Sequence, residues 1–147
     1  MLLRKRLPLP FTKIETDSYV AVQLLEQKKT LDFASLKYMA EQVEGSFTFT
    51  VLDQRNHLYI VKGINPFCMY YFPKTRLFLY ASTEEILFRA LGQMQFCFGP
   101  IQRIVPKAGE IIKISTKGKL SKSVFSFGYE QADYLYWPME FDQCSPV

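Results

Sequence analysis

The sequence predicts an α+β fold, in which antiparallel strands and helices occupy separate parts of the chain. Three observations support this prediction. Apolar residues recur at helical spacing in residues 17–45 and 82–92, and they alternate strictly with polar residues in SFTFTVLD, residues 46–53, the first of several predicted antiparallel strands. The length of 147 residues, with a hydrophobic fraction of 48%, suits one packed core, so we treat residues 1–147 as a single domain.

The N-terminal part is predicted to contain a lead-in and a first helix. Residues 1–14 include two prolines and are predicted to be an extended lead-in. An amphipathic helix follows over residues 17–27, with Thr16 or Asp17 as its N-cap. Its predicted apolar face consists of Val20, Leu24 and Leu25.

A second helix is predicted in LDFASLKYMAEQVEG, residues 31–45, where the helical pattern repeats. Asp32 is its predicted N-cap. Gly45 is predicted to end it, because glycine adopts the left-handed conformation that often follows a helix. The predicted buried stripe consists of Leu36, Met39, Ala40 and Val43.

Four strands are predicted directly after the second helix. In SFTFTVLD, residues 46–53, Phe47, Phe49 and Val51 share one face, while serine and threonine occupy much of the other. The turn QRN leads into HLYIVKG, residues 57–63, so these segments are predicted to form a β-hairpin. After GINP, FCMYYF and RLFLYAS are two further strands joined by PKT. We therefore predict a four-stranded meander.

A short helix and a second hairpin complete the predicted elements. STEEILFRALG, residues 82–92, is predicted to be helical, with Ser82 or Thr83 as its N-cap. GEIIKIS and KSVFSF are predicted strands on either side of the turn TKGKL. Residues 129–147 are rich in aromatic residues and are predicted to form an irregular tail.

Charge and hydropathy argue against two kinds of partner. The net charge of +4 is modest and comes in part from RKR near the N-terminus, so nucleic-acid binding is disfavoured. No apolar run approaches the roughly 18 residues of a membrane span. MLLRKRLPLP also lacks the ordered regions of a signal peptide. We expect no membrane association and a cytoplasmic location.

Motif content predicts neither a metal site nor a cofactor. The three cysteines, Cys68, Cys97 and Cys144, are widely spaced, and His57 is the single histidine, which disfavours a zinc site. We interpret the cysteines as buried free thiols. The chain has no glycine-rich phosphate loop, no GxSxG elbow and no HExxH motif.

Two further groups of polar residues are interpreted as structural. A conventional catalytic relay would require His57, which lies in a predicted hairpin turn and is expected to face solvent. Glu84 and Glu85 are adjacent in a predicted helix, so their side chains point about 100° apart. We expect them to interact with the helix dipole and not to act as an acid/base pair.

Five short motifs, taken in order, resemble a known family. They are ETDS before a helix, EGSFTFTVLD, GINPFCMYYF, LFLYASTEEIL and GEIIKIS. Their order and spacing over residues 15–126 resemble the second half of a class II glutamine amidotransferase domain. This N-terminal-nucleophile glutaminase module occurs in glucosamine-6-phosphate synthase, amidophosphoribosyltransferase and asparagine synthetase.

The resemblance implies a fold, a reaction and one binding residue. The fold is a four-layer αββα sandwich, and the reaction is hydrolysis of the glutamine side-chain amide, which supplies ammonia to a synthase partner. The family nucleophile is an N-terminal cysteine whose own α-amino group serves as the base. The Asp of the ETD motif holds the α-amino group of the substrate, and this role carries over to Asp17.

The sequence departs from the family pattern at the nucleophile. It begins with Met1 and Leu2, and nothing in it corresponds to the family's opening CGI, its arginine loop or its HNG segment. Cleavage before Ser46 would expose a serine nucleophile, but Ser46 matches an ordinary strand residue of the family. Cys68 and Cys97 lie within the chain and carry no α-amino group. We therefore expect no catalytic residue here and no glutaminase activity of the chain alone.

Three functional hypotheses follow. The first is an amidotransferase-like domain that binds glutamine only if its catalytic half is supplied from elsewhere. The second is a non-enzymatic interaction module, in which a second copy or a partner protein covers exposed sheet edges. The third is a basic nucleic-acid-binding domain, whose affinity would fall steeply with salt.

Overall fold

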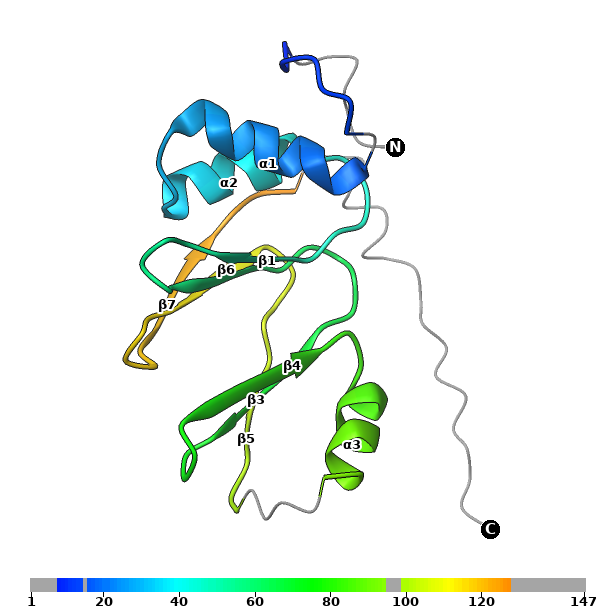
Figure 1. Cartoon of the computed structure of the whole chain (residues 1–147), viewed down its shortest axis with the longest axis vertical. Coiled ribbons are helices and arrows are strands. Elements are labelled where there is room, and N and C mark those ends of the chain that lie inside the picture. The colour runs from blue at the N-terminus through cyan, green and yellow to red at the C-terminus, as the bar shows by residue number, and fades with distance from the viewer. Residues whose placement is uncertain (1–7, 15, 95–98, 128–147) are drawn as a thin grey trace.

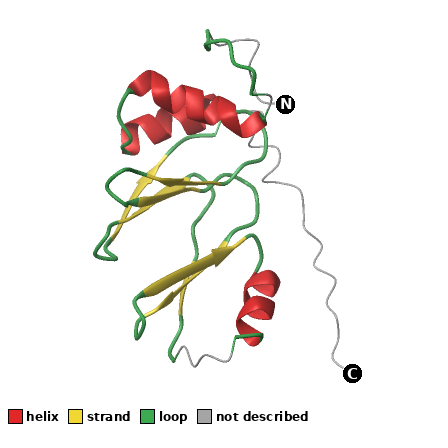
Figure 2. Cartoon of the chain, in the orientation of Figure 1, coloured by secondary structure: helices red, strands yellow, loops and turns green. Residues whose placement is uncertain are grey.

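The computed structural model describes residues 8–14, 16–94 and 99–127, which form a mixed α+β fold with two antiparallel sheets (Figures 1 and 2). The helices are α1 (Asp17–Lys28), α2 (Phe33–Gln42) and α3 (Glu84–Gly92). The strands are β1 (Phe49–Leu52), β2 (Leu58–Val61), β3 (Cys68–Phe72), β4 (Leu77–Ala81), β5 (Gln102–Ile104), β6 (Glu110–Ile114) and β7 (Leu120–Val124). No described helix has the length and apolar character needed to cross a membrane.

The strands divide into a four-stranded sheet of order β1-β2-β6-β7 and a three-stranded sheet of order β4-β3-β5. The predicted hairpins β1–β2, β3–β4 and β6–β7 are confirmed. The predicted four-stranded meander is wrong, because the chain leaves the first sheet after β2 and begins the second with β3. Strand β5 was not predicted, since its three residues are mostly exposed and show no alternation.

One face of the first sheet packs against α1 and α2. Tyr59 and Val61 of β2 and Ile111 of β6 point to this side, as alternation along a strand requires. The predicted apolar stripes of both helices lie against them. The buried residues of this layer are Val20, Ala21, Leu24, Leu36, Met39, Ala40, Val43, Phe47, Tyr59, Val61, Ile111 and Phe125.

The opposite face of the first sheet packs against the second sheet. Ile60 of β2 and Ile112 of β6 alternate with the residues that face the helices, and both are fully buried. They form one cluster with Ile114 and with Met69 of β3. This cluster forms the apolar contact between the two sheets in the described part of the chain, and we call it the inter-sheet cluster.

The far face of the second sheet packs against α3. Cys68, Tyr70 and Phe72 of β3 are buried with Leu87 of α3. Figure 1 accordingly shows α1 and α2 on one side of the first sheet, the second sheet on its other side, and α3 beside the second sheet. The chain therefore shields its two sheets with helices from opposite sides.

The helix ends agree in part with the predicted caps. Asp32 accepts a hydrogen bond from the Ser35 backbone N–H at 2.9 Å and completes a capping box, as predicted for an N-cap. Thr83, and not Ser82, caps α3. Helix α2 ends at Gln42, so Gly45 does not terminate it. Val43 is already extended, and its side chain is buried in the core.

Replacing Asp32 with alanine is expected to destabilise the fold by about 1 kcal/mol at neutral pH, because the cap of α2 is lost. Hydrogen bonds from Ser35 lower the pKa of Asp32 below its ordinary value of 3.8. The stabilisation is thus present above that value and is lost as the pH falls through the folded-state pKa. Urea unfolding at several pH values measures both effects. Asp32→Asn, which keeps the acceptor oxygen, should be nearly neutral at pH 7.

Candidate functional site

The predicted substrate-binding residue, Asp17, is the first residue of α1. Its side chain and the neighbouring Glu15 lie outside the residues that the structure describes. Thr16 occupies the N-cap position in an extended conformation, and its side chain makes no capping hydrogen bond. The prediction that Thr16 or Asp17 is the N-cap is confirmed for Thr16 by its position, although the Thr16 hydroxyl makes no capping hydrogen bond. Asp17 is the next residue, at position N1.

A polar loop connects β2 to β3 and carries a buried lysine. Lys62 is only 9% exposed. Its ammonium donates hydrogen bonds to the carbonyl oxygens of Gly63, at 2.9 Å, and Asn65, at 2.7 Å. Among the residues that the structure describes, both hydrogen-bond acceptors of this ammonium are backbone oxygens, and neither is a carboxylate. Burial lowers the pKa of Lys62, since it penalises the charged form.

The same loop is tied to the segment that precedes β1. The Asn65 backbone N–H donates to the Phe47 carbonyl at 3.3 Å, and its side-chain amide donates to the Ser46 carbonyl at 3.4 Å. The Thr48 hydroxyl donates to the Asn65 carbonyl at 3.0 Å. In Figure 1 the β2–β3 loop, which we call the crossing loop, and the N-terminal end of α1 both lie on the right-hand side of the molecule. The motifs EGSF and GINP thus meet, although Phe47 and Gly63 are sixteen positions apart in sequence.

The pH dependence of stability should reveal the buried ammonium. Between the lowered pKa of folded Lys62 and its ordinary value of 10.5, the unfolded chain binds more protons, so stability rises with pH in that window. Below the window the penalty is fully present. Urea unfolding between neutral pH and about pH 10.5 should give a steeper rise for the native chain than for Lys62→Met. Parallel curves for the two proteins would contradict this account.

The hairpin turn between β1 and β2 contains an Asp–His pair. His57 Nδ1 lies 2.8 Å from Asp53 Oδ2, and the other carboxylate oxygen accepts the backbone N–H groups of Arg55 and His57. Burial would raise the pKa of Asp53, but these hydrogen bonds outweigh it and the pKa is lowered. The prediction that His57 faces solvent is wrong, because only a fifth of its side chain is exposed. A turn-stabilising carboxylate explains the pair without a catalytic role.

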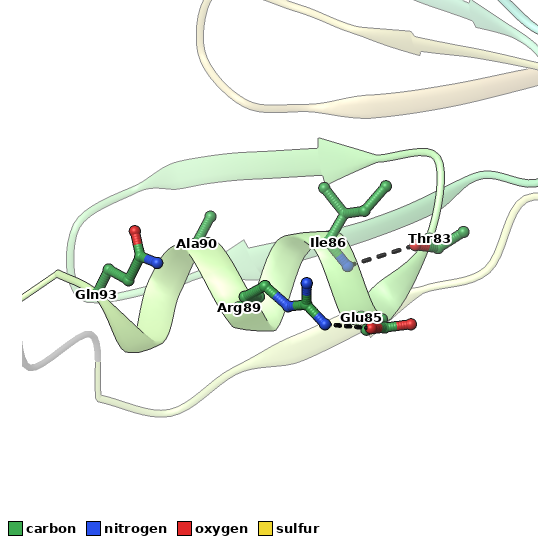
Figure 3. A pocket seen from close by; sticks show the side chains of 6 residues that line it. All are labelled: Thr83, Glu85, Ile86, Arg89, Ala90 and Gln93. Carbon is green, nitrogen blue, oxygen red and sulfur yellow. Dashed lines mark hydrogen bonds and ion pairs between the residues drawn. The ribbon is translucent and has the colours of Figure 1, made fainter.

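A shallow depression of about 420 Å³ lies along the outer face of α3 (Figure 3). Glu85 and Arg89 form an ion pair there at 2.6 Å, and about three quarters of each side chain is exposed. The Thr83 hydroxyl accepts the Ile86 backbone N–H as a helix cap. The lining residues are Thr83, Glu85, Ile86, Arg89, Ala90 and Gln93. They include no nucleophile paired with a base, so this surface has no evident chemistry.

Helix α3 is joined to the second sheet by a polar network. Glu84 Oε1 accepts a hydrogen bond from the Tyr70 hydroxyl at 2.8 Å and lies 2.5 Å from Arg103 Nη2. Burial and the bond to Glu84 raise the pKa of Tyr70. Both Glu84 and Glu85 lie in the first turn of α3, as the helix-dipole interpretation requires. The two carboxylates have different partners and do not form an acid/base pair.

The cysteines and possible metal ligands add no reactive group to the described part of the chain. Cys68 is buried, and its thiol donates toward the Ala81 carbonyl at 3.5 Å, which confirms a buried free thiol at this position. Cys97 and Cys144 lie outside the described residues. Among residues 8–14, 16–94 and 99–127, no three His, Cys, Asp or Glu side chains are grouped as metal ligands.

From the sequence, Asp17 was predicted as a binding residue, and its role stays a prediction; Lys62 and Asp53 were missed. A lysine near a strand end is normally exposed, and nothing in VKGINP signals that its amine turns back to two carbonyls. Asp53 had a usable signal, since an aspartate at the start of a turn commonly accepts backbone N–H groups. No family model, no curated protein and no solved structure matches the chain.

Proposed function

We propose that the chain is a class II glutamine amidotransferase-like domain that does not hydrolyse glutamine by itself. The observation that carries the proposal is the arrangement of its elements. Two antiparallel sheets pack face to face through the inter-sheet cluster, with α1 and α2 outside one sheet and α3 outside the other. This order is compatible with the αββα sandwich that the five motifs imply.

The motif positions in the structure also support the proposal. ETDS begins α1, EGSF leads into β1, and GINP forms the crossing loop between the sheets. The loop contributes anchoring hydrogen bonds and a buried lysine, and no described group in it is placed as a nucleophile. In the proposed function, Asp17 would bind the α-ammonium group of glutamine. The cysteine nucleophile, its α-amino base and the donors for the substrate carboxylate would come from outside residues 1–147.

The chain expressed alone is expected to release no glutamate from glutamine above the uncatalysed rate. The decisive experiment isolates the native protein from its source cells and determines its mass, its N-terminal residue and any chain bound to it. Glutamine hydrolysis is then measured on the same material. A cysteine-initiated species or partner chain with glutaminase activity would support the proposal.

The role of Asp17 is tested on any such active species. Asp17→Asn should raise the KM for glutamine at least tenfold, because the charge partner of the substrate ammonium is lost. Asp32→Asn is the matched control, since it replaces another helix-start aspartate outside the ETDS motif. A native species that begins at Met1, has no partner and lacks glutaminase activity would contradict the enzymatic part of the proposal.

A protein-interaction module is the second candidate, favoured by exposed apolar side chains on strands that are edge strands among the described residues. Leu52 of β1 and Val124 of β7 are about two-thirds exposed at opposite edges of the first sheet. Tyr80 is also exposed, on the edge strand β4 of the second sheet. Sedimentation equilibrium over a range of concentrations would distinguish self-association from a monomer that awaits a different partner.

A further inference from the structure

Strand β7 lies at one edge of the first sheet in the part of the chain that the structure describes. Among the described strands it pairs with β6 alone. Four of its five residues are exposed, and the fifth is half-buried. An open edge of this kind can accept a further strand, because backbone donors and acceptors on its outer side are free to pair.

The pattern of hydrogen bonds between β6 and β7 shows which backbone groups of β7 point away from β6. The Ser115 N–H donates to the Lys119 carbonyl, and the Phe125 N–H donates to the Gly109 carbonyl. Bonded pairs alternate along an antiparallel ladder, so the bonds to β6 come from Ser121 and Ser123. The three residues that alternate with these serines therefore direct their backbone N–H and C=O groups to the side of β7 that faces away from β6. Those residues are Leu120, Lys122 and Val124.

The same three residues continue the inter-sheet face beyond its buried part. Lys122 lies opposite Ile112, and Leu120 lies opposite Ile114. Both isoleucines belong to the inter-sheet cluster. Residues opposite each other share a face, yet Leu120 is 38% exposed and Val124 is 65% exposed. An added strand would cover both apolar side chains and bring one of its own residues next to Lys122.

Charge favours an acidic residue at that central position, because Lys122 is half exposed even though its ammonium also lies 3.2 Å from Glu110 Oε2. Lys113, Lys117, Lys119 and Lys122 lie in the β6–β7 hairpin, and Glu110 is its only acidic residue. A second copy paired edge to edge through β7 would bring lysines together, and like charges in a cross-strand pair are destabilising. Nucleic acid fits less well, because residues 110–124 include no aromatic side chain on which a base could stack.

We infer that β7 binds an extended segment of a partner protein as an added strand, with the pattern apolar-x-acidic-x-apolar. The two apolar residues pack beside Leu120 and Val124, and the acidic residue pairs with Lys122. Backbone hydrogen bonds supply affinity, and the three alternate side chains supply specificity. The inference depends on the β7 edge alone and stands whether or not the chain belongs to an amidotransferase.

The test titrates the full chain with a synthetic peptide in which Val-Thr-Glu-Thr-Val is flanked by threonines. Backbone NMR shifts should change at residues 120–124 and not at β1, the other edge of the same sheet. Replacing the central Glu of the peptide with Lys should weaken binding by about fivefold or more, since a favourable cross-strand pair becomes a repulsive one. Lys122→Glu in the protein should reverse this preference.

Lys37→Glu is the matched control. Lys37 and Lys122 each pair with a glutamate, and their side chains are 48% and 50% exposed. Lys37→Glu should leave peptide binding unchanged. Equal binding of the two peptides, shift changes at β1 instead of β7, or no binding would each overturn the inference.

A final variant separates a partner from this chain's own acidic segment. Residues 128–147 carry four acidic residues and no lysine or arginine. The variant neutralises them through Glu130→Gln, Asp133→Asn, Glu140→Gln and Asp142→Asn. Peptide affinity that matches the native chain supports a partner. A tenfold gain in affinity would assign the β7 edge to the chain's own segment and overturn the inference.

Discussion

Gly63→Ala is expected to destabilise the fold by about 3 kcal/mol or more, the upper range for overpacking. A Cβ atom at Gly63 would lie 2.2 Å from the Phe47 carbonyl oxygen and 3.0 Å from its carbonyl carbon. Both are backbone atoms, so no side-chain rotation can relieve the clash. The φ angle is not the problem, because Gly63 is not among the residues with positive φ.

The surroundings of Phe47 prevent it from moving aside. Its carbonyl accepts the Asn65 N–H, and its buried ring stacks on Phe49 at 5.1 Å and on Phe125 at 6.0 Å. Displacing the Phe47 backbone would therefore disturb the core under α1 and α2 as well as the crossing loop. We expect the substitution to destabilise both the first sheet and the helices that pack on it.

Urea unfolding of Gly63→Ala and Gly92→Ala measures this effect against a matched control. A Cβ at Gly92, the last residue of α3, would meet no atom within 4 Å. Gly92→Ala should be neutral or stabilising by about 0.4–1 kcal/mol, because alanine restricts the unfolded chain. A Gly63→Ala protein that unfolds at the same urea concentration as the native chain would show that the loop does not pass this close to Phe47.

Ile112→Ala is expected to cost about 2–5 kcal/mol, the range for truncating a fully buried aliphatic side chain. Ile112 has no exposed surface and lies in the inter-sheet cluster with Ile60 and Met69. Neither helix layer can close the resulting cavity, since the cluster lies between the two sheets. The second sheet should loosen from the first.

Val124→Ala on the neighbouring strand is the control for Ile112→Ala. Val124 is 65% exposed, so its truncation should change the free energy of unfolding by less than about 0.5 kcal/mol. Combining Ile112→Ala with Met69→Ala tests the packing of the two sheets directly. Residues that share one buried cluster should show a coupling of about 0.5–3 kcal/mol, and strict additivity would argue against this cluster.

Local elements of the fold were predictable from the sequence, because their signals involve near neighbours. The capping box of α2 needs only Asp32 and Ser35, three positions apart. The apolar stripe of α2 follows from helical spacing, and each predicted member of it is buried. The three predicted hairpins are joined by short turns that favour pairing of adjacent strands.

Which strands of different hairpins pair with each other was not predictable in the same way. Strand β2 pairs with β6, which lies about fifty residues further along the chain, and not with β3, which follows it. Strands β2 and β3 are each buried on both faces, so neither has a periodicity that indicates which strand lies beside it. Strand β5 has too few residues to show a period, and its pairing with β3 supplies the order that its sequence lacks.

The features of the candidate site likewise differ in whether local sequence or long-range packing explains them. Local sequence signals predict the helix that begins at Asp17, and the resemblance of ETDS to a glutaminase motif suggested a role for that residue. The burial of Lys62 against two carbonyls follows from long-range packing, as does the exposure of Leu120 and Val124 at a sheet edge within the described residues. Burial depends on which distant segments come to cover a residue, and no short stretch of sequence contains that information.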